Sequence, residues 1–166
     1  MPALSTRNSA RLLAGAAFAV GLCLLAPRVY AQSAPFSGMA GAWSGEGRID
    51  LQAGTIEPIR CRATYAVGGD GSTLQQQLRC ASESYRFEVS SNVQSRAGSL
   101  SGSWSEATRN VSGILSGRVA AGRIQARVDA SPFVADLTVH TNGNHQSVLI
   151  VPQGSDVKLV AVNMRK

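Results

Sequence analysis

The two histidines of the chain, His140 and His145, are its clearest candidates for metal or acid–base chemistry. They flank Asn142-Gly143, a dipeptide that favours a two-residue hairpin loop because both residues accept a positive φ. With that pair as the loop, the two imidazoles face each other on one side of the hairpin. They are weak candidates for metal ligands, since a zinc site needs at least a third protein ligand. The sequence favours two polar residues on a wet face, so no metal site is predicted.

Nucleophilic catalysis finds little support in the sequence. There is no G-x-S-x-G elbow, and Ser101, Ser103 and Ser105 alternate with apolar or small residues as outward strand positions do. Asp136 and His140 share a strand face but lie about 13 Å apart, too far for the hydrogen bond of a catalytic triad. No pair among the ten carboxylates is marked for glycoside hydrolysis. We therefore predict no catalytic residue and no cofactor, and we favour a non-catalytic protein.

The first 31 residues are typical of a secretory signal peptide. Arg7 and Arg11 precede Leu12–Ala26, an apolar run of fifteen residues that is shorter than the roughly 20 needed to span a bilayer. Val29-Tyr30-Ala31 fits cleavage after Ala31. The processed chain, residues 32–166, is predicted to be periplasmic or secreted, with no integral membrane span.

The charge of the processed chain argues against nucleic acid as a partner. The whole chain has a formal net charge of +6, with sixteen basic and ten acidic residues. Three basic residues and no acidic ones belong to the signal peptide, so the processed chain keeps thirteen and ten, a net charge of +3. Binding to phosphates needs concentrated Lys and Arg, whereas here they are scattered among Glu and Asp.

Cys61 and Cys80 are the two cysteines that remain after processing, and they are predicted to form a disulfide. An even number of cysteines in an exported protein favours a bridge, and two thiolates are too few for zinc. Both cysteines belong to segments that alternate around a Gly-rich turn, and one register places Cys61 opposite Cys80 and Ala63 opposite Leu78. Such a bridge closes a loop of about 20 residues and contributes about 3 kcal/mol. Two buried free thiols are the alternative.

Apolar and polar residues alternate with period two along nearly all of residues 41–164, as in antiparallel sheets with one wet face. Turn residues interrupt this pattern at Gly68–Ser72, Ala121-Gly122, Asn142-Gly143 and Gln153–Asp156. The first of these lacks the Lys and the helix of a phosphate loop. We predict one all-β domain, a single antiparallel up-and-down barrel of eight to ten strands, with a two-sheet sandwich as the alternative. An outer-membrane barrel fits less well, because it would need an apolar outward face with aromatic girdles.

Glycines beside large residues on the same strand face leave two interpretations open. Trp43 shares its face with Gly45 and Gly47, and Trp104 shares its face with Gly102. Such vacant positions are typical of a cavity with aromatic walls, or of strand bends where glycine permits close packing. In the cavity interpretation, the ligand-binding residues are Trp43, Tyr65 and Trp104.

The segment Phe36–Gly47 contains Gly41-Ala42-Trp43 and resembles the G-x-W first strand of calycins, the superfamily of lipocalins and avidins. The resemblance implies an up-and-down barrel whose end is plugged by Trp43, with a basic residue of the last strand, Arg165, across the ring. The other lipocalin motifs and the ring of tryptophans of avidins are missing, so the resemblance implies no particular ligand.

The processed chain is also similar to small exported bacterial proteins of unknown function, through the stretches Gly102–Glu106 and Gln146–Ile150. That similarity implies export and a β domain but no activity. Together, these features predict an exported, non-catalytic barrel that binds a small apolar ligand in its interior. The alternative is an envelope-associated module that contacts a protein or a glycan through its polar strand faces.

Overall fold

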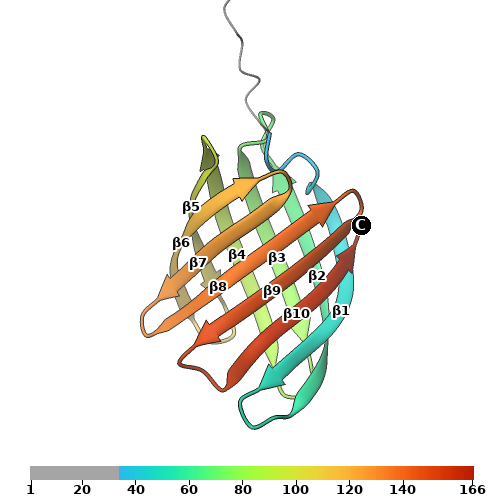
Figure 1. Cartoon of the computed structure of the whole chain (residues 1–166), viewed down its shortest axis with the longest axis vertical. Helices are drawn as coiled ribbons and strands as arrows, with labels where there is room; N and C mark the ends of the chain where they lie inside the picture. Colours follow the sequence, from blue (N-terminus) through green and yellow to red (C-terminus); the bar gives the residue numbers. More distant parts are fainter. Residues whose placement is uncertain (1–33) are drawn as a thin grey trace, which may run out of the picture. The chain divides into compact units, whose positions relative to one another are not determined.

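A computed structural model describes residues 34–166, and the predicted signal peptide and its cleavage site lie outside the described residues. The described residues form a closed barrel of antiparallel strands in sequence order, closed by pairing of the first strand with the last (Figure 1). The ten strands are β1 Gly41–Leu51, β2 Ile56–Val67, β3 Thr73–Ala81, β4 Arg86–Arg96, β5 Ser99–Glu106, β6 Val111–Ala120, β7 Arg123–Ala130, β8 Phe133–Asn142, β9 His145–Gln153 and β10 Val157–Arg165. The predicted up-and-down barrel is confirmed, and the two-sheet sandwich is not what forms.

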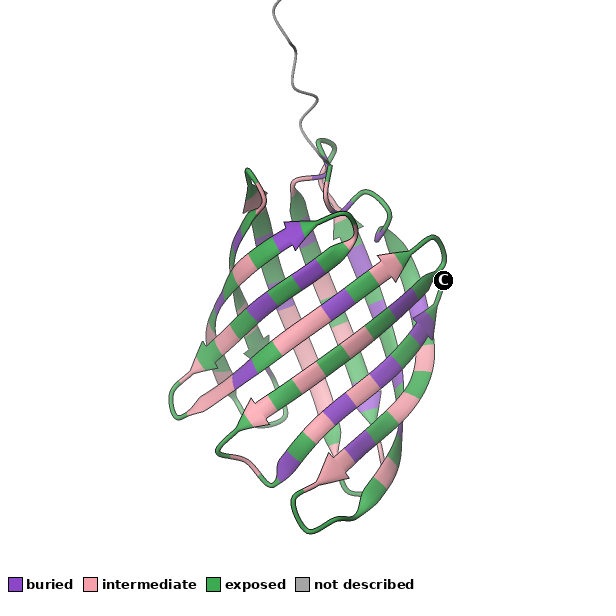
Figure 2. Ribbon diagram, in the orientation of Figure 1, coloured by how far each residue is buried: buried purple, intermediate pink, exposed green. Residues whose placement is uncertain are grey.

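Buried and exposed residues alternate along the strands, as the period of two predicts (Figure 2). Strand β2 is an example, because Cys61 and Ala63 are buried inside the barrel while Arg60 and Arg62 are exposed outside it. None of the seven aromatic side chains of residues 34–166 is exposed. This interior is apolar and the outward face is polar, the reverse of the pattern in outer-membrane barrels. The described part of the chain also holds no helix long and apolar enough to cross a bilayer.

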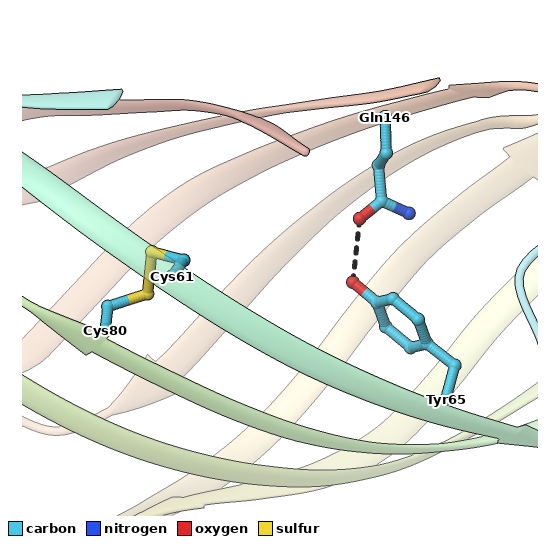
Figure 3. The surroundings of a disulfide bond; sticks show 4 residues. All are labelled: Cys61, Tyr65, Cys80 and Gln146. Atoms are coloured by element: carbon cyan, nitrogen blue, oxygen red, sulfur yellow. Dashed lines mark hydrogen bonds between the residues drawn. A yellow bond between two sulfur atoms is a disulfide. The ribbon is translucent and has the colours of Figure 1, made fainter. Parts of the chain in front are cut away.

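The β2–β3 hairpin has the register that the sequence predicts. Cys61 pairs with Cys80 and Ala63 pairs with Leu78. The two cysteines form a disulfide with a Cα–Cα distance of 4.1 Å, and both are buried on the inner side of the barrel (Figure 3). The predicted bridge is therefore confirmed, and it joins two neighbouring strands of the barrel wall.

The inward glycines mark places where neighbouring strands approach closely. A Cβ atom at Gly45 would lie 1.9 Å from the carbonyl oxygen of Asn163, and one at Gly113 would lie 1.8 Å from that of Asp129. These positions are filled by the backbone of the next strand, which allows the sheet to coil sharply. Of the two interpretations of these glycines, packing is the correct one at these positions.

The predicted turns at Gly68–Ser72 and Ala121-Gly122 lie where the sequence places them, the turn at Gln153–Asp156 begins one residue later, and the fourth turn is shifted by one residue. Asn142 is the last residue of β8, and the two-residue loop is Gly143-Asn144. Gly143 has a φ of +57°, whereas Asn142 keeps the extended conformation of the strand. A loop with glycine at its first central position fits the type II′ preference rather than the type I′ turn expected for Asn142-Gly143.

Candidate functional site: an interior cavity

One end of the barrel is closed by the turn that precedes β1. Phe36 and Met39 from this turn are buried in the core, and Phe36 has no exposed surface. The indole N–H of Trp43 donates a 2.7 Å hydrogen bond to the carbonyl oxygen of Met39. The backbone N–H of Phe36 donates to the carbonyl oxygen of Gly71 in the β2–β3 loop. Trp43 and this turn together form the plug of the barrel.

A cation lies across the ring of Trp43, but it is not the predicted one. The ammonium group of Lys166 is 5.4 Å from the centre of the ring and donates a 2.6 Å hydrogen bond to the carbonyl oxygen of Ala40. The prediction of Arg165 at this place is wrong, because the alternation of β10 turns Met164 inward and Arg165 outward. Lys166 follows the end of the strand and can fold back over the plug.

Beneath the plug, a short chain of buried polar groups crosses the interior. The Tyr65 hydroxyl donates a 2.8 Å hydrogen bond to Gln146 Oε1 (Figure 3). Gln146 Nε2 in turn donates a 3.0 Å hydrogen bond to Thr141 Oγ1. The Tyr65 ring packs edge-on against Trp43, with ring centres 6.4 Å apart. Burial raises the pKa of the Tyr65 phenol well above its usual value, so it remains a neutral donor. These groups satisfy one another and seal the plug from below.

A cavity of about 430 Å³ occupies the barrel between the plug and the opposite end. Its wall is mostly aliphatic and includes Leu74, Leu115, Val128, Leu137, Val148 and Ile150. The disulfide between β2 and β3 is also part of the wall. This volume lies within the range of roughly 300–1,000 Å³ that is usual for small-molecule sites.

The cavity extends to the loops at the end of the barrel opposite the plug. There the Tyr85 hydroxyl donates a hydrogen bond to the carboxylate of Asp156, which raises the pKa of the phenol. The Tyr85 ring stacks on Phe87 with ring centres 6.0 Å apart, and the Arg109 guanidinium lies 4.9 Å above Phe87. Three loops are thus linked across the mouth of the cavity by polar and aromatic contacts.

Glu106 is the buried carboxylate of the site, and its role is to hold the β5–β6 loop. Its oxygens accept hydrogen bonds from the backbone N–H groups of Glu88, Thr108 and Arg109 and from the Thr108 hydroxyl. Burial acts to raise the pKa of Glu106, but these hydrogen bonds outweigh it, and the pKa lies below its ordinary value. Glu106 is therefore an ionised structural group.

Two solved structures are similar to this barrel along most of their length. The crystal structure of Rv2717c from M. tuberculosis matches with a TM-score of 0.61 and 15% identity, covering 78% of this chain and 94% of that one. The S-type phycobiliprotein lyase CPES from Guillardia theta matches with a TM-score of 0.50 and 10% identity, covering 79% and 90%. The chain has a calycin-like fold. No family model and no curated protein sequence matches it, so the likeness concerns the fold alone.

The three predicted ligand-binding residues lie in two different parts of the calycin-like barrel. Tyr65 and Trp104 line the cavity, whereas Trp43 lies in the plug. The half-buried Trp104 packs edge-on against Phe133 with ring centres 5.8 Å apart, and its indole N–H donates to the carbonyl oxygen of Ile114 over 3.2 Å.

The two histidines lie outside the calycin-like barrel, on its exposed face. His145 pairs with Asn142 and His140 pairs with Ser147, so the predicted side-by-side arrangement is wrong. The reason is the shifted loop, which moves the register of the hairpin by two residues. Residues 34–166 contain no group of three or more His, Cys, Asp or Glu side chains placed to hold a metal ion.

Proposed function

We propose that this protein is an exported, non-catalytic binding domain that holds a small apolar ligand in its barrel. The observation that carries the proposal is the cavity of about 430 Å³ with its largely aliphatic wall. Each methylene group that moves from water into such a site contributes about 0.8 kcal/mol. Roughly eight or nine methylene groups therefore contribute about 6–7 kcal/mol, which exceeds the lower end of the cost of association, about 4 kcal/mol.

Export is supported by the signal-like first 31 residues and by the disulfide, since such bridges persist in oxidising compartments. The similar solved structure from Guillardia theta is named a phycobiliprotein lyase, which concerns that protein. For this chain the likeness supports a barrel scaffold on which a ligand site can be built, because the same fold serves many functions.

The test compares two variants of neighbouring residues on β9. Val148 lines the cavity and Leu149 points outward with 39% of its surface exposed. Purified protein is titrated with medium-chain alkenes, ketones and alcohols, and the binding heat and the tryptophan emission are followed. We expect saturable binding that Val148→Phe abolishes and Leu149→Phe retains.

Two results would count against the proposal. The first is the absence of saturable binding for every compound of the panel. The second is equal binding by both variants, because this would indicate adsorption on the outer surface. The variant Trp104→Phe identifies the source of the change in tryptophan emission. If the variant still releases binding heat but its emission no longer changes, the emission change comes from Trp104 in the cavity wall.

A further inference from the structure

Strand β3 brings one amide side chain into the aliphatic wall of the cavity. Leu74, Gln76 and Leu78 are successive inward residues of this strand, and all three line the cavity. The Gln76 side chain is held from the neighbouring strand β4, where the Ser91 hydroxyl donates a 2.9 Å hydrogen bond to Gln76 Oε1. Ser91 is itself buried and lines the cavity, so the contact fixes the amide on the inner side of the wall.

The hydrogen bond from Ser91 uses the amide oxygen of Gln76, and the amino group of Gln76 has no hydrogen-bond partner among residues 34–166. Every fully enclosed side-chain nitrogen or oxygen of the described chain has a hydrogen-bond partner. Gln76 Nε2 has none, so it is accessible, and the space that it borders is the cavity. An unpaired amide donor in an apolar wall costs about 1–3 kcal/mol unless something accepts its hydrogen bond.

Two other polar side chains that line the cavity, Tyr65 and Glu106, differ from Gln76 in this respect. The Tyr65 hydroxyl is already bonded to Gln146, and the Glu106 carboxylate accepts several hydrogen bonds from its own loop. Gln76 therefore provides a hydrogen-bond donor in the cavity wall that remains available to a ligand.

The register of the sheet also places this donor in one row with two aromatic residues, directly beside Tyr65 and two strands away from Trp104. Tyr65, Gln76, Ser91 and Trp104 are directly opposite one another on the successive strands β2, β3, β4 and β5. A molecule that accepts a hydrogen bond from Gln76 lies near the Trp104 ring, whose emission can report it.

We propose that Gln76 determines the specificity of the cavity, and that its ligand is a neutral apolar carbonyl compound such as a ketone, ester or lactone. The carbonyl oxygen accepts a hydrogen bond from Gln76 Nε2, and the hydrocarbon part lies against the aliphatic wall. This inference rests on the proposed function, because it names the ligand class of the same cavity.

A neutral acceptor fits this place better than an anion. Arg109 is the one cationic side chain in the described lining, and it lies at the mouth over Phe87. It also donates to the carbonyl oxygen of Arg86 and lies 3.7 Å from the Glu106 carboxylate. A carboxylate beside Gln76 would be buried without a counter-charge, which is far more costly than burying a carbonyl group.

The experiment compares two ligands of equal shape, 2-nonanone and 2-methyl-1-nonene, in which C=CH₂ replaces C=O. The dissociation constants of both are measured on the intact protein and on the variants Gln76→Leu and Gln76→Met. The matched control is Gln77→Leu, since Gln77 is the next residue of β3, points outward and accepts a hydrogen bond from the Ser90 hydroxyl. Comparing the ratio of the two constants removes the difference in hydration between ketone and alkene.

We expect both Gln76 variants to weaken ketone binding relative to alkene binding by about three- to tenfold, and Gln77→Leu to leave the ratio unchanged. An unchanged ratio in the Gln76 variants, with both ligands bound, would overturn this inference and leave the proposed function standing. Absence of binding by either ligand to the unmodified protein would instead overturn the proposed function. Thermal unfolding of each variant verifies that it is folded, and two different replacements of Gln76 guard against the failure of one.

Discussion

The Tyr65 hydroxyl on β2 and the Gln146 side chain on β9 meet 2.8 Å apart inside the barrel, although β1 and β10 lie between their strands. The bond ties together two parts of the wall that do not pair through their backbones. Both residues are almost fully buried, with 4% and 2% of their surface exposed. This contact therefore stabilises both the pairing of β1 with β10, which closes the barrel, and the plug above the cavity.

Removing the Tyr65 hydroxyl should destabilise the fold by about 1–3 kcal/mol, because Tyr65→Phe leaves the buried oxygen of Gln146 without its donor. Urea unfolding of the variant measures this loss. The double variant Tyr65→Phe/Gln146→Met replaces both partners and should recover part of it. A Tyr65→Phe protein as stable as the unmodified one would show that the hydrogen bond contributes nothing.

Tyr65 should also make the fold sensitive to alkaline pH. Burial raises the pKa of its phenol in the folded protein, while the unfolded chain keeps a value of about 10. Below pH 10 the phenol is neutral in both states, and above it the unfolded chain releases the proton first. The free energy of unfolding therefore falls by up to about 1.4 kcal/mol per pH unit above pH 10.

Unfolding in urea at a series of pH values from 8 to 11 tests this dependence. The decline should be shallower in Tyr65→Phe. The hydrogen bond to Asp156 also raises the pKa of Tyr85 in the folded protein, so Tyr85→Phe is measured in parallel to separate the contribution of Tyr85 from that of Tyr65. If the free energy of unfolding falls equally with pH in Tyr65→Phe and in the unmodified protein, the loss of stability at alkaline pH comes from other groups.

Breaking the Cys61–Cys80 bridge should cost about 3 kcal/mol, because the bridge closes a loop with a sequence separation of 19 residues. The double variant Cys61→Ala/Cys80→Ala and the protein in reductant should lose similar amounts in urea unfolding. A control with reductant added to the double variant should show no further change. If the bridge were absent from the native protein, mass spectrometry would detect two free thiols and reductant would have no effect.

The alternation of side chains was sufficient to predict most of the fold. It predicts the strands, the inner face and the register of the β2–β3 hairpin, because a one-residue slip would turn every apolar side chain outward. The same logic fails at the β8–β9 hairpin, where Gly143-Asn144 forms the loop instead of Asn142-Gly143. Both loops are compatible with short-range turn preferences. The two registers differ by two residues and keep the same side chains on the inner face, so alternation does not distinguish them.

The candidate site was only partly predictable. Gln76, Glu106 and Gln146 all occupy inward positions of alternating strands, so polar residues on the apolar face were a signal available in the sequence. What alternation cannot reveal is which of them find partners. The hydrogen bond of Gln146 depends on Tyr65, which is 81 residues away in the sequence, and one of the bonds of Glu106 depends on Glu88 of the neighbouring strand. The volume of the cavity depends on all ten strands.

The close approach of β1 to β10 predicts a severe effect of a single methyl group. In Gly45→Ala the new Cβ would lie 1.9 Å from the Asn163 carbonyl oxygen, and backbone atoms cannot move aside easily. We expect a loss of about 3 kcal/mol or more in the free energy of unfolding. The matched control is Gly69→Ala, because a Cβ at Gly69 meets no atom within 4 Å. Equal stability of the two variants would show that the strands do not approach each other in this way.

The loop held by Glu106 should depend on the charge of that carboxylate. Glu106→Gln keeps the shape of the side chain but places an amino group against backbone N–H groups, so we expect the free energy of unfolding to fall by about 1.5–3 kcal/mol at neutral pH.

The effect of Glu106 should also depend on pH, because the folded protein lowers the pKa of its carboxyl group. Its stabilising contribution is present above the ordinary pKa near 4.5 and is lost as the pH falls through the pKa in the folded protein. The difference in stability between Glu106→Gln and the unmodified protein should therefore shrink when urea unfolding is repeated in acid. The control is Glu46→Gln, since Glu46 is exposed and forms a surface ion pair with Arg60. A difference that stays constant down to pH 3 would mean that the Glu106 carboxylate acts through its shape rather than its charge.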